Sequence, residues 1–248
     1  PYVDATGVSE AAGSINTTAA GAAGGAVSIT AGGALALGNI NTSGTTSGVG
    51  GDVTLVTTAG GITTANGTTI NTSGAGGNNN AGTVILRSNN TAVGLSGAIT
   101  ASGAGTGTGT VSLGTGTGAN SVGAVTQPQA TGIITASTLN VNSDGGGVTL
   151  GQSNELVNLG TVVTTGGAFT YVDATGVSEA AGSINTTAAG AAGGAVSITA
   201  GGALALGNIN TSGTTSGVGG DVTLVTTAGG ITTANGTTIT TSGAGGNN

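Results

Sequence analysis

Short apolar segments alternate with clusters of Gly, Ser, Thr and Asn along the whole chain. Within these segments apolar and polar side chains follow each other with a period of two, as in Val27-Ser28-Ile29 and Val53-Thr54-Leu55. This is the period of a half-buried β-strand, whereas a helix would place apolar residues about 3.6 positions apart. Frequent glycine also disfavours helix, at about 1 kcal/mol for each residue. The pattern predicts an all-β protein of many short strands joined by turns.

One set of these segments returns at nearly constant intervals. Its members begin at Val27, Val53, Val84, Val111, Leu139, Phe169 and Val196. Successive starts therefore differ by 26, 31, 27, 28, 30 and 27 in residue number. A period of this length is typical of a solenoid, in which each rung, meaning one full turn of the coil, buries its apolar face against its neighbours. With about three short strands in each rung of roughly 26–31 residues, the sequence predicts a parallel β-helix.

A second column repeats an apolar residue, then Asn or Thr, then a small residue, as in Ile40-Asn41-Thr42. In stacked rungs the central residues would form a ladder of like polar side chains that hydrogen-bond along the axis. The predicted ladder consists of Asn16, Asn41, Asn71, Thr100, Thr135, Thr164, Asn185, Asn210 and Thr240. The apolar residues of both columns would point inward. The predicted core comprises Val27, Ile29, Ile40, Val53, Leu55, Ile70, Val84, Leu86, Ile99, Val111, Leu113, Ile134, Leu139, Val141, Phe169 and Tyr171.

A much longer repeat contains these rungs. Residues 2–79 return as residues 171–248, with Asn71 replaced by Thr240 as the only difference, so Tyr2 and Tyr171 begin two copies of a 169-residue repeat. The first and last of the recurring segments, which begin at Val27 and Val196, are also 169 residues apart. We therefore expect six rungs in each long repeat, or about 29 Å along the axis at a strand spacing of about 4.8 Å. Residues 1–248 are predicted to form one continuous β-solenoid.

Composition removes several classes of function. The 248 residues include 55 Gly but no Cys, His, Lys, Met or Trp, so disulfides, thiolate metal sites, Ser-His-Asp triads and a P-loop are all excluded. The net charge of −7 combines eight carboxylates with Arg87, which argues against a nucleic-acid partner. No apolar run approaches the roughly 20 residues of a membrane span. We expect no cofactor and no membrane span in this segment.

Two further groups of residues are candidates for chemistry. Asp144, Glu155 and Arg87 are the residue types with which some β-helix enzymes cleave polysaccharides, but the rung assignment places them in different rungs or distant turns. The segment Asn142–Gly147 has the Gly-Asp composition of calcium-binding turns, yet one Asp is a poor start for six to eight oxygen ligands, so a solvated turn is favoured. The sequence predicts no enzyme, no catalytic residue and no metal site.

Specific phrases of the sequence resemble a known family. Gly24–Ile40 and Gly50–Leu55 are similar to the haemagglutination-activity repeats of filamentous haemagglutinins and related large exoproteins, and the similarity extends over essentially the whole chain. The resemblance implies a right-handed parallel β-helix that is exported across a Gram-negative envelope. Such repeats occur in adhesins, cytolysins, contact-inhibition toxins and stalks, so it implies an architecture rather than an activity. The near-identical long repeat is more regular than typical stalks of the family.

These observations predict a structural role. We expect a secreted, extracellular protein of the bacterial cell surface or a biofilm, in which the solenoid is an adhesin shaft or a filament. The expected partners are further copies of the same repeat, either in the same chain or in an end-to-end homopolymer, since uncapped terminal rungs expose unpaired strands. An alternative is direct binding of a glycan or other surface by the Asn and Thr faces. A polysaccharide-degrading enzyme is the third alternative.

Overall fold

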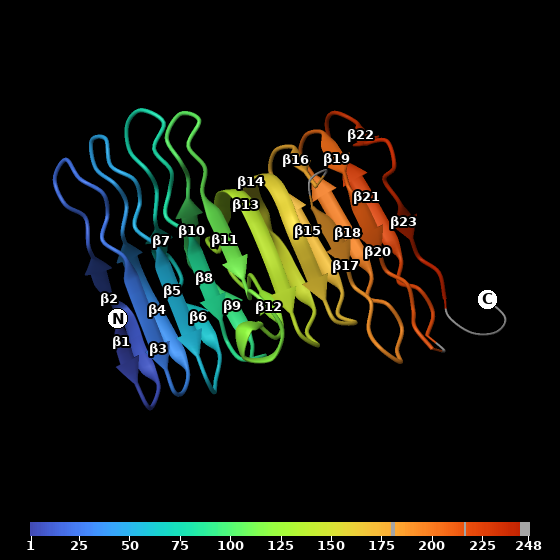
Figure 1. Ribbon diagram of the computed structural model, residues 1–248, viewed down its shortest axis with the longest axis horizontal. Coiled ribbons are helices and arrows are strands. Elements are labelled where there is room, and N and C mark those ends of the chain that lie inside the picture. The colour runs from blue at the N-terminus through green and yellow to red at the C-terminus, as the bar shows by residue number, and fades with distance from the viewer. Residues whose placement is uncertain (180–181, 216, 244–248) are drawn as a thin grey trace.

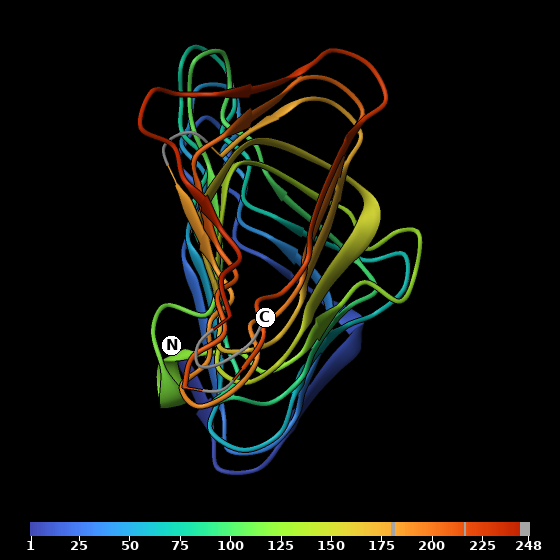
Figure 2. The same cartoon turned by 90° about the vertical axis from the view of Figure 1, so that its right-hand side faces the viewer.

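The computed structural model describes residues 1–179, 182–215 and 217–243, apart from the side chains of residues 11 and 12. The chain forms a parallel β-solenoid of about nine rungs. Figure 1 shows the strands side by side along the long axis, with β1 and β23 at opposite ends of the coil. Figure 2, which looks along the coil, shows successive rungs winding round a common interior. The all-β, parallel β-helix prediction is confirmed.

All described strands belong to one 23-stranded sheet, and all their pairings are parallel. The elements are β1 (Tyr2–Asp4), β2 (Val8–Asn16), β3 (Val27–Ala31), β4 (Leu35–Asn41), β5 (Val53–Thr57), β6 (Ile62–Thr64), β7 (Thr69–Asn71), β8 (Val84–Arg87), β9 (Val93–Leu95), β10 (Ala98–Ala101), β11 (Thr110–Leu113), the 3-10 turn η1 (Gly118–Asn120), β12 (Val125–Thr126), β13 (Ile134–Ser143), β14 (Val148–Thr164), β15 (Phe169–Asp173), β16 (Val177–Ser178), β17 (Ser183–Asn185), β18 (Val196–Ala200), β19 (Leu204–Leu206), β20 (Asn208–Asn210), β21 (Val222–Thr226), β22 (Ile231–Thr233) and β23 (Ile239–Thr240).

The pairings arrange the strands on three faces. Face 1 holds β1, β3, β5, β8, β11, the second half of β13, the end of β14, β17, β20 and β23. Face 2 holds the starts of β2 and β4, then β6, β9, β12, the start of β14, β15, β18 and β21. Face 3 holds the ends of β2 and β4, then β7, β10, the start of β13, the middle of β14, β16, β19 and β22.

Like residues stack on like residues inside the coil. On face 1, Val27 pairs with Val53 and Val53 with Val84, while on face 3 Ile40 pairs with Ile70. Every residue predicted for the core is buried, and one apolar cluster extends through the rungs. Because each inward side chain meets a similar one above and below, small residues suffice to fill the narrow interior.

Long loops project from the corner between face 3 and face 1 in the first half of the coil. A buried Thr closes the base of the two loops that follow β4 and β7: the Thr42 hydroxyl donates to the Gly51 carbonyl at 2.6 Å and the Thr72 hydroxyl to the Gly82 carbonyl at 2.9 Å. Successive loops stack so closely that a Cβ on Gly50 would lie 1.7 Å from the Thr72 carbonyl oxygen. Glycine is required at this position for that close approach. We call residues 17–25, 43–51, 73–82 and their counterparts the projecting loops.

The middle of the coil differs from the prediction of uniform rungs. Thr135 pairs with Glu155 and Val148 pairs with Phe169, so each of these partners is reached after a markedly shorter path than elsewhere in the coil. These short rungs have no projecting loop: β13 and the 17-residue β14 bend directly from one face to the next. The predicted rung length is therefore wrong for this part of the chain, because a rung without a long loop needs fewer residues.

The short rungs also correct the predicted columns. Leu139 is followed on face 1 by Leu159, and Phe169 lies on face 2 after Val148, so Leu139 and Phe169 do not belong to one column. From β1 to β15, which begin the two copies of the long repeat, the chain passes through six rungs and one additional face. Each long repeat thus contains one strand more than the predicted six rungs.

Candidate functional site

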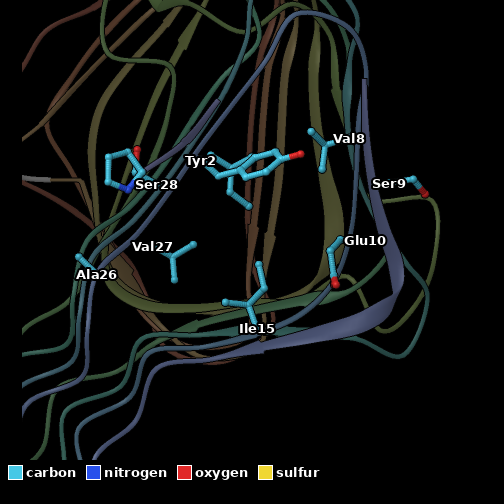
Figure 3. Close-up of a pocket in the computed structure, with 10 residues that line it drawn as sticks. Tyr2, Val8, Ser9, Glu10, Ile15, Ala26, Val27 and Ser28 are labelled. Carbon is cyan, nitrogen blue, oxygen red and sulfur yellow. The ribbon is translucent and has the colours of Figure 1, made fainter. Parts of the chain in front are cut away.

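An open hollow lies at the end of the coil that carries the N-terminus (Figure 3). It measures about 470 Å³ and is lined by residues of the first two rungs, among them Tyr2, Val8 and Ile15 of the first and Val27 of the second. The second copy places the same residues inside the coil: Tyr2 is 54% exposed, whereas its counterpart Tyr171 is fully buried. The hollow is therefore the uncovered end of the core and not a built ligand site.

The charged candidates for polysaccharide chemistry do not form a pair of facing carboxylates. Arg87 ends β8 and donates from Nη1 to the Asn120 side chain at 2.7 Å, and its Nε is buried with no hydrogen-bond partner. Asp144 accepts from the Gly118 amide at 3.1 Å, at the start of η1. Glu155 lies on β14, opposite Thr135. These side chains therefore do not place a carboxylic acid and a carboxylate on either side of one glycosidic bond, as polysaccharide cleavage requires.

The turn from Asn142 to Gly147 does not gather calcium ligands. Asp144 is its one carboxylate, and Gly145 adopts a positive φ of 85° that makes the turn tight. Among the residues that the structure describes, no group of three or more His, Cys, Asp or Glu side chains could hold a metal ion. The buried Asn142 Oδ1 has no hydrogen-bond partner. It lies beside a shallow polar hollow of about 350 Å³ lined also by Ser112, Asn140 and Thr161.

The predicted polar ladder splits into two columns. Asn16, Asn41 and Asn71 stack and continue through Thr100 to Thr135, as predicted. The column then reaches Glu155 instead of Thr164, which is buried and pairs with Ser143. The second column runs through Val163. It continues through Asn185, Asn210 and Thr240. The assignment of Thr164 to the ladder is therefore wrong, because Val162 is the inward residue of this segment, so Val163 takes the outward central position and Thr164 points into the coil.

The hydrogen bonds of the ladder also differ from the prediction. Asn41 Oδ1 accepts from the Ser43 amide at 3.1 Å and Asn71 Oδ1 from the Ser73 amide at 3.0 Å. These bonds cap the turn that follows each strand, so they run along the chain and not from rung to rung. Asn at this position consequently starts the projecting loop.

A buried polar cluster that the sequence reasoning missed lies in the short rungs. Gln127, Asn154 and Asp173 are 6%, 0% and 2% exposed and come from three successive rungs. Gln127 Nε2 donates to Asn154 Oδ1 at 2.6 Å, and Asn154 Nδ2 donates to the Val172 carbonyl at 3.0 Å. Asp173 Oδ2 accepts from the Leu156 amide at 3.0 Å. We call these three residues the buried polar ladder. The signal for it in the sequence is the absence of a Gly-rich loop between Val148 and Thr164.

The aromatic residues of β15 lie beside this cluster. The rings of Phe169 and Tyr171 are stacked with centroids 6.2 Å apart, and both side chains are fully buried. The Tyr171 hydroxyl donates to Asp173 Oδ2. Burial first, and then the nearby charge of Asp173, raises the pKa of Tyr171 above its usual range, so the hydroxyl stays protonated and remains a donor.

Glu179 is the other buried carboxyl group. Its side chain is fully buried at the corner that follows β16, where Oε2 accepts from the Gly207 amide at 2.5 Å and Oε1 has no partner. Burial raises the pKa of Glu179 to about 7, against a smaller opposing effect of the Gly207 hydrogen bond. The group therefore changes charge near neutral pH.

Comparisons with known proteins identify no family for this chain. No protein-family model matches it, and neither a curated protein nor a solved structure shows detectable similarity. The resemblance to filamentous haemagglutinin repeats thus stays a prediction, while the solenoid architecture rests on the structure. In the described residues, no helix is long and apolar enough to cross a membrane.

Proposed function

We propose that this chain is the structural solenoid of a secreted bacterial surface protein, forming an adhesin shaft or an extracellular filament. The observation that carries the proposal is the unbroken sheet, in which every described strand is hydrogen-bonded to its neighbours along the axis. A continuous ladder of backbone hydrogen bonds around one apolar core makes a stiff rod whose length is proportional to the number of rungs. A shaft needs these properties and no reactive group.

The test separates a shaft from an adhesive surface. The chain is displayed on a Gram-negative cell with a reporter domain at its outer end, with or without one further 169-residue unit. A shaft should raise the reporter by about 30 Å, which is six rungs and one strand at about 4.8 Å for each rung. Adhesion to host cells and glycan-coated surfaces should not change. Adhesion that rises with each added unit would contradict the shaft and favour direct binding.

Direct binding of a glycan is the second candidate, and the polar hollow on face 1 favours it. Ser112, Asn140 and Thr161 present uncharged hydroxyl and amide groups there, which suit sugar hydroxyls. If this hollow binds glycan, Asn140→Ala should abolish binding on a glycan array. The outward change Thr54→Ala, on the same face two rungs before Ser112, should leave binding intact.

A further inference from the structure

The two copies of the long repeat have the same internal structure but lie on different faces. Tyr2 pairs with Ile29 in the first copy, and the corresponding Tyr171 pairs with Ile198 in the second. The first pair lies on face 1 and the second on face 2. Equal sequences with equal pairings are therefore rotated round the axis by one of the three faces.

The rotation originates in the two short rungs. Over β13 and β14 the chain turns from face 3 to face 1 with no projecting loop, at Ser137 and at Val157. Omitting two long loops leaves room for one additional strand segment within a single long repeat. Rungs of normal length would have returned Tyr171 to the face of Tyr2.

The second copy could lie on the same faces as the first or be rotated by one face, and we call these two arrangements the phases of the coil. Apolar packing alone does not choose between the two phases. Inward Val, Ile and Leu residues line all three faces, so a rung displaced by one face would still place apolar side chains against apolar side chains. A register is specified only where a displaced partner costs free energy. Buried polar groups have this property, because each loses its hydrogen bonds when its neighbour moves.

The buried polar ladder supplies such partners at the short rungs. Asn154 Oδ1 accepts from the Ile134 amide at 2.9 Å in the preceding rung, and Asn154 Nδ2 donates to the Val172 carbonyl in the next. Asp173 accepts from Leu156 of the preceding rung and from the Thr175 amide at 2.9 Å. In the observed phase each polar side chain thus makes at least one hydrogen bond to another rung, whereas the bond from Thr175 to Asp173 is local to the chain.

We propose that β13, β14 and the buried polar ladder form a phase-shifting segment, which turns each copy of the long repeat by one face relative to the copy before it. The inference deepens the proposed shaft function, and only the purpose of the rotation rests on that function. The rotation makes the projecting loops of successive copies point to different sides of the rod. Three copies would return the pattern to its first face after about 19 rungs, or about 91 Å.

Two pairs of spin labels test the phase directly, because the chain contains no Cys. In the observed phase Ser28 and Ser183 lie on the same face six rungs apart. Double electron–electron resonance on S28C/S183C should then give about 29 Å, and S28C/S197C a longer distance. Without a phase shift Ser197 would take the place of Ser183, so a distance of about 29 Å for S28C/S197C would overturn the proposal.

The role of the ladder is tested by making it apolar. The triple variant Gln127→Leu/Asn154→Leu/Asp173→Leu replaces all three polar side chains by apolar ones. We expect its S28C/S183C distance distribution to broaden or to split between the two phases. A single unchanged distance would show that the ladder does not set the phase. If this variant does not fold, Asp173→Asn decides in the same way, since it keeps the size of the side chain and removes one acceptor. None of these distances depends on whether the protein acts as a shaft.

Discussion

At the scale of the residue, the inward and outward positions of each strand differ sharply in what they tolerate. Ile40 is 1% exposed and lies between Ile15 and Ile70 of the neighbouring rungs, whereas the adjacent Asn41 points outward and caps a turn. A charge at the inward position would be surrounded by apolar side chains from three rungs.

We therefore predict that Ile40→Asp prevents folding, while Ile40→Val costs only about 0.5–1.5 kcal/mol of unfolding free energy. The matched outward change, Asn41→Asp, keeps the acceptor for Ser43 and should cost less than about 0.5 kcal/mol. Circular dichroism and urea unfolding measure all three. A folded, stable Ile40→Asp variant would show that the assignment of the inward side is wrong.

Glu179 predicts a dependence of stability on pH. Its folded pKa of about 7 lies above the ordinary value of 4.5. The folded state consequently binds the proton more tightly, so this contribution to stability is complete below about pH 4.5 and is lost as the pH rises through 7. Between pH 5 and pH 8 we expect a loss of about 1–3 kcal/mol from this group.

Glu179→Gln should remove that loss, because a neutral amide does not titrate. Urea unfolding at pH 5 serves as the internal control, since the wild-type carboxyl is protonated there and the two proteins should be similarly stable. At pH 8 the variant should be the more stable one. Equal losses in both proteins between pH 5 and pH 8 would contradict the assignment.

At the scale of the element, the projecting loops depend on direct contact between backbones. A Cβ on Gly50 would approach the Thr72 carbonyl oxygen to 1.7 Å, whereas a Cβ on Gly94 of β9 would meet only a side-chain methyl of Thr63 at 3.6 Å. The first glycine is required by the stacking of loops, and the second is not.

We predict that Gly50→Ala destabilises the protein by about 2 kcal/mol or more, and that Gly94→Ala stays within about 0.5 kcal/mol of the wild type. Thermal unfolding compares the two variants. Equal stability of both would mean that the loops do not stack in solution.

The elements also show where sequence reasoning succeeds. The strands around Val27, Val53 and Val84 are predictable because alternation and a nearly constant period are local signals. The path of Val148–Thr164 is not, because the same alternation runs through three faces without a Gly-rich loop to mark the corners. The buried polar ladder escapes sequence reasoning for the same reason: its members come from different rungs, and only the pairing brings them together.

At the scale of the whole molecule, neighbours and not sequence decide how well each rung is protected. β5 and β21 have the same sequence, but β5 lies between β3 and β8, whereas among the described strands β21 pairs only with β18. Leu55 is fully buried, and its counterpart Leu224 is only partly buried. Stability in a solenoid is the sum of such contacts between neighbours.

Hydrogen exchange should therefore be slow in β5 and fast in β21. Peptides that cover residues 53–57 and 222–226 have the same mass, so mass spectrometry should show two isotope envelopes for one peptide sequence, one protected and one exchanged. A single envelope would contradict a gradient of protection along the coil. The longer peptides that contain Asn71 or Thr240 assign each envelope to its copy.

The sequence by itself determined the architecture of this protein: the period of two, the recurring Val and Ile columns and the 169-residue repeat specify short stacked strands, and the predicted core is buried. These signals are local or repeat along the chain, so they can be read without coordinates. Only the tertiary structure decided the phase of the coil. Which face Tyr171 occupies depends on how sharply β13 and β14 bend and on which partners satisfy Asn154 and Asp173. Apolar columns that are alike on all three faces cannot encode that choice, whereas buried hydrogen bonds between rungs can.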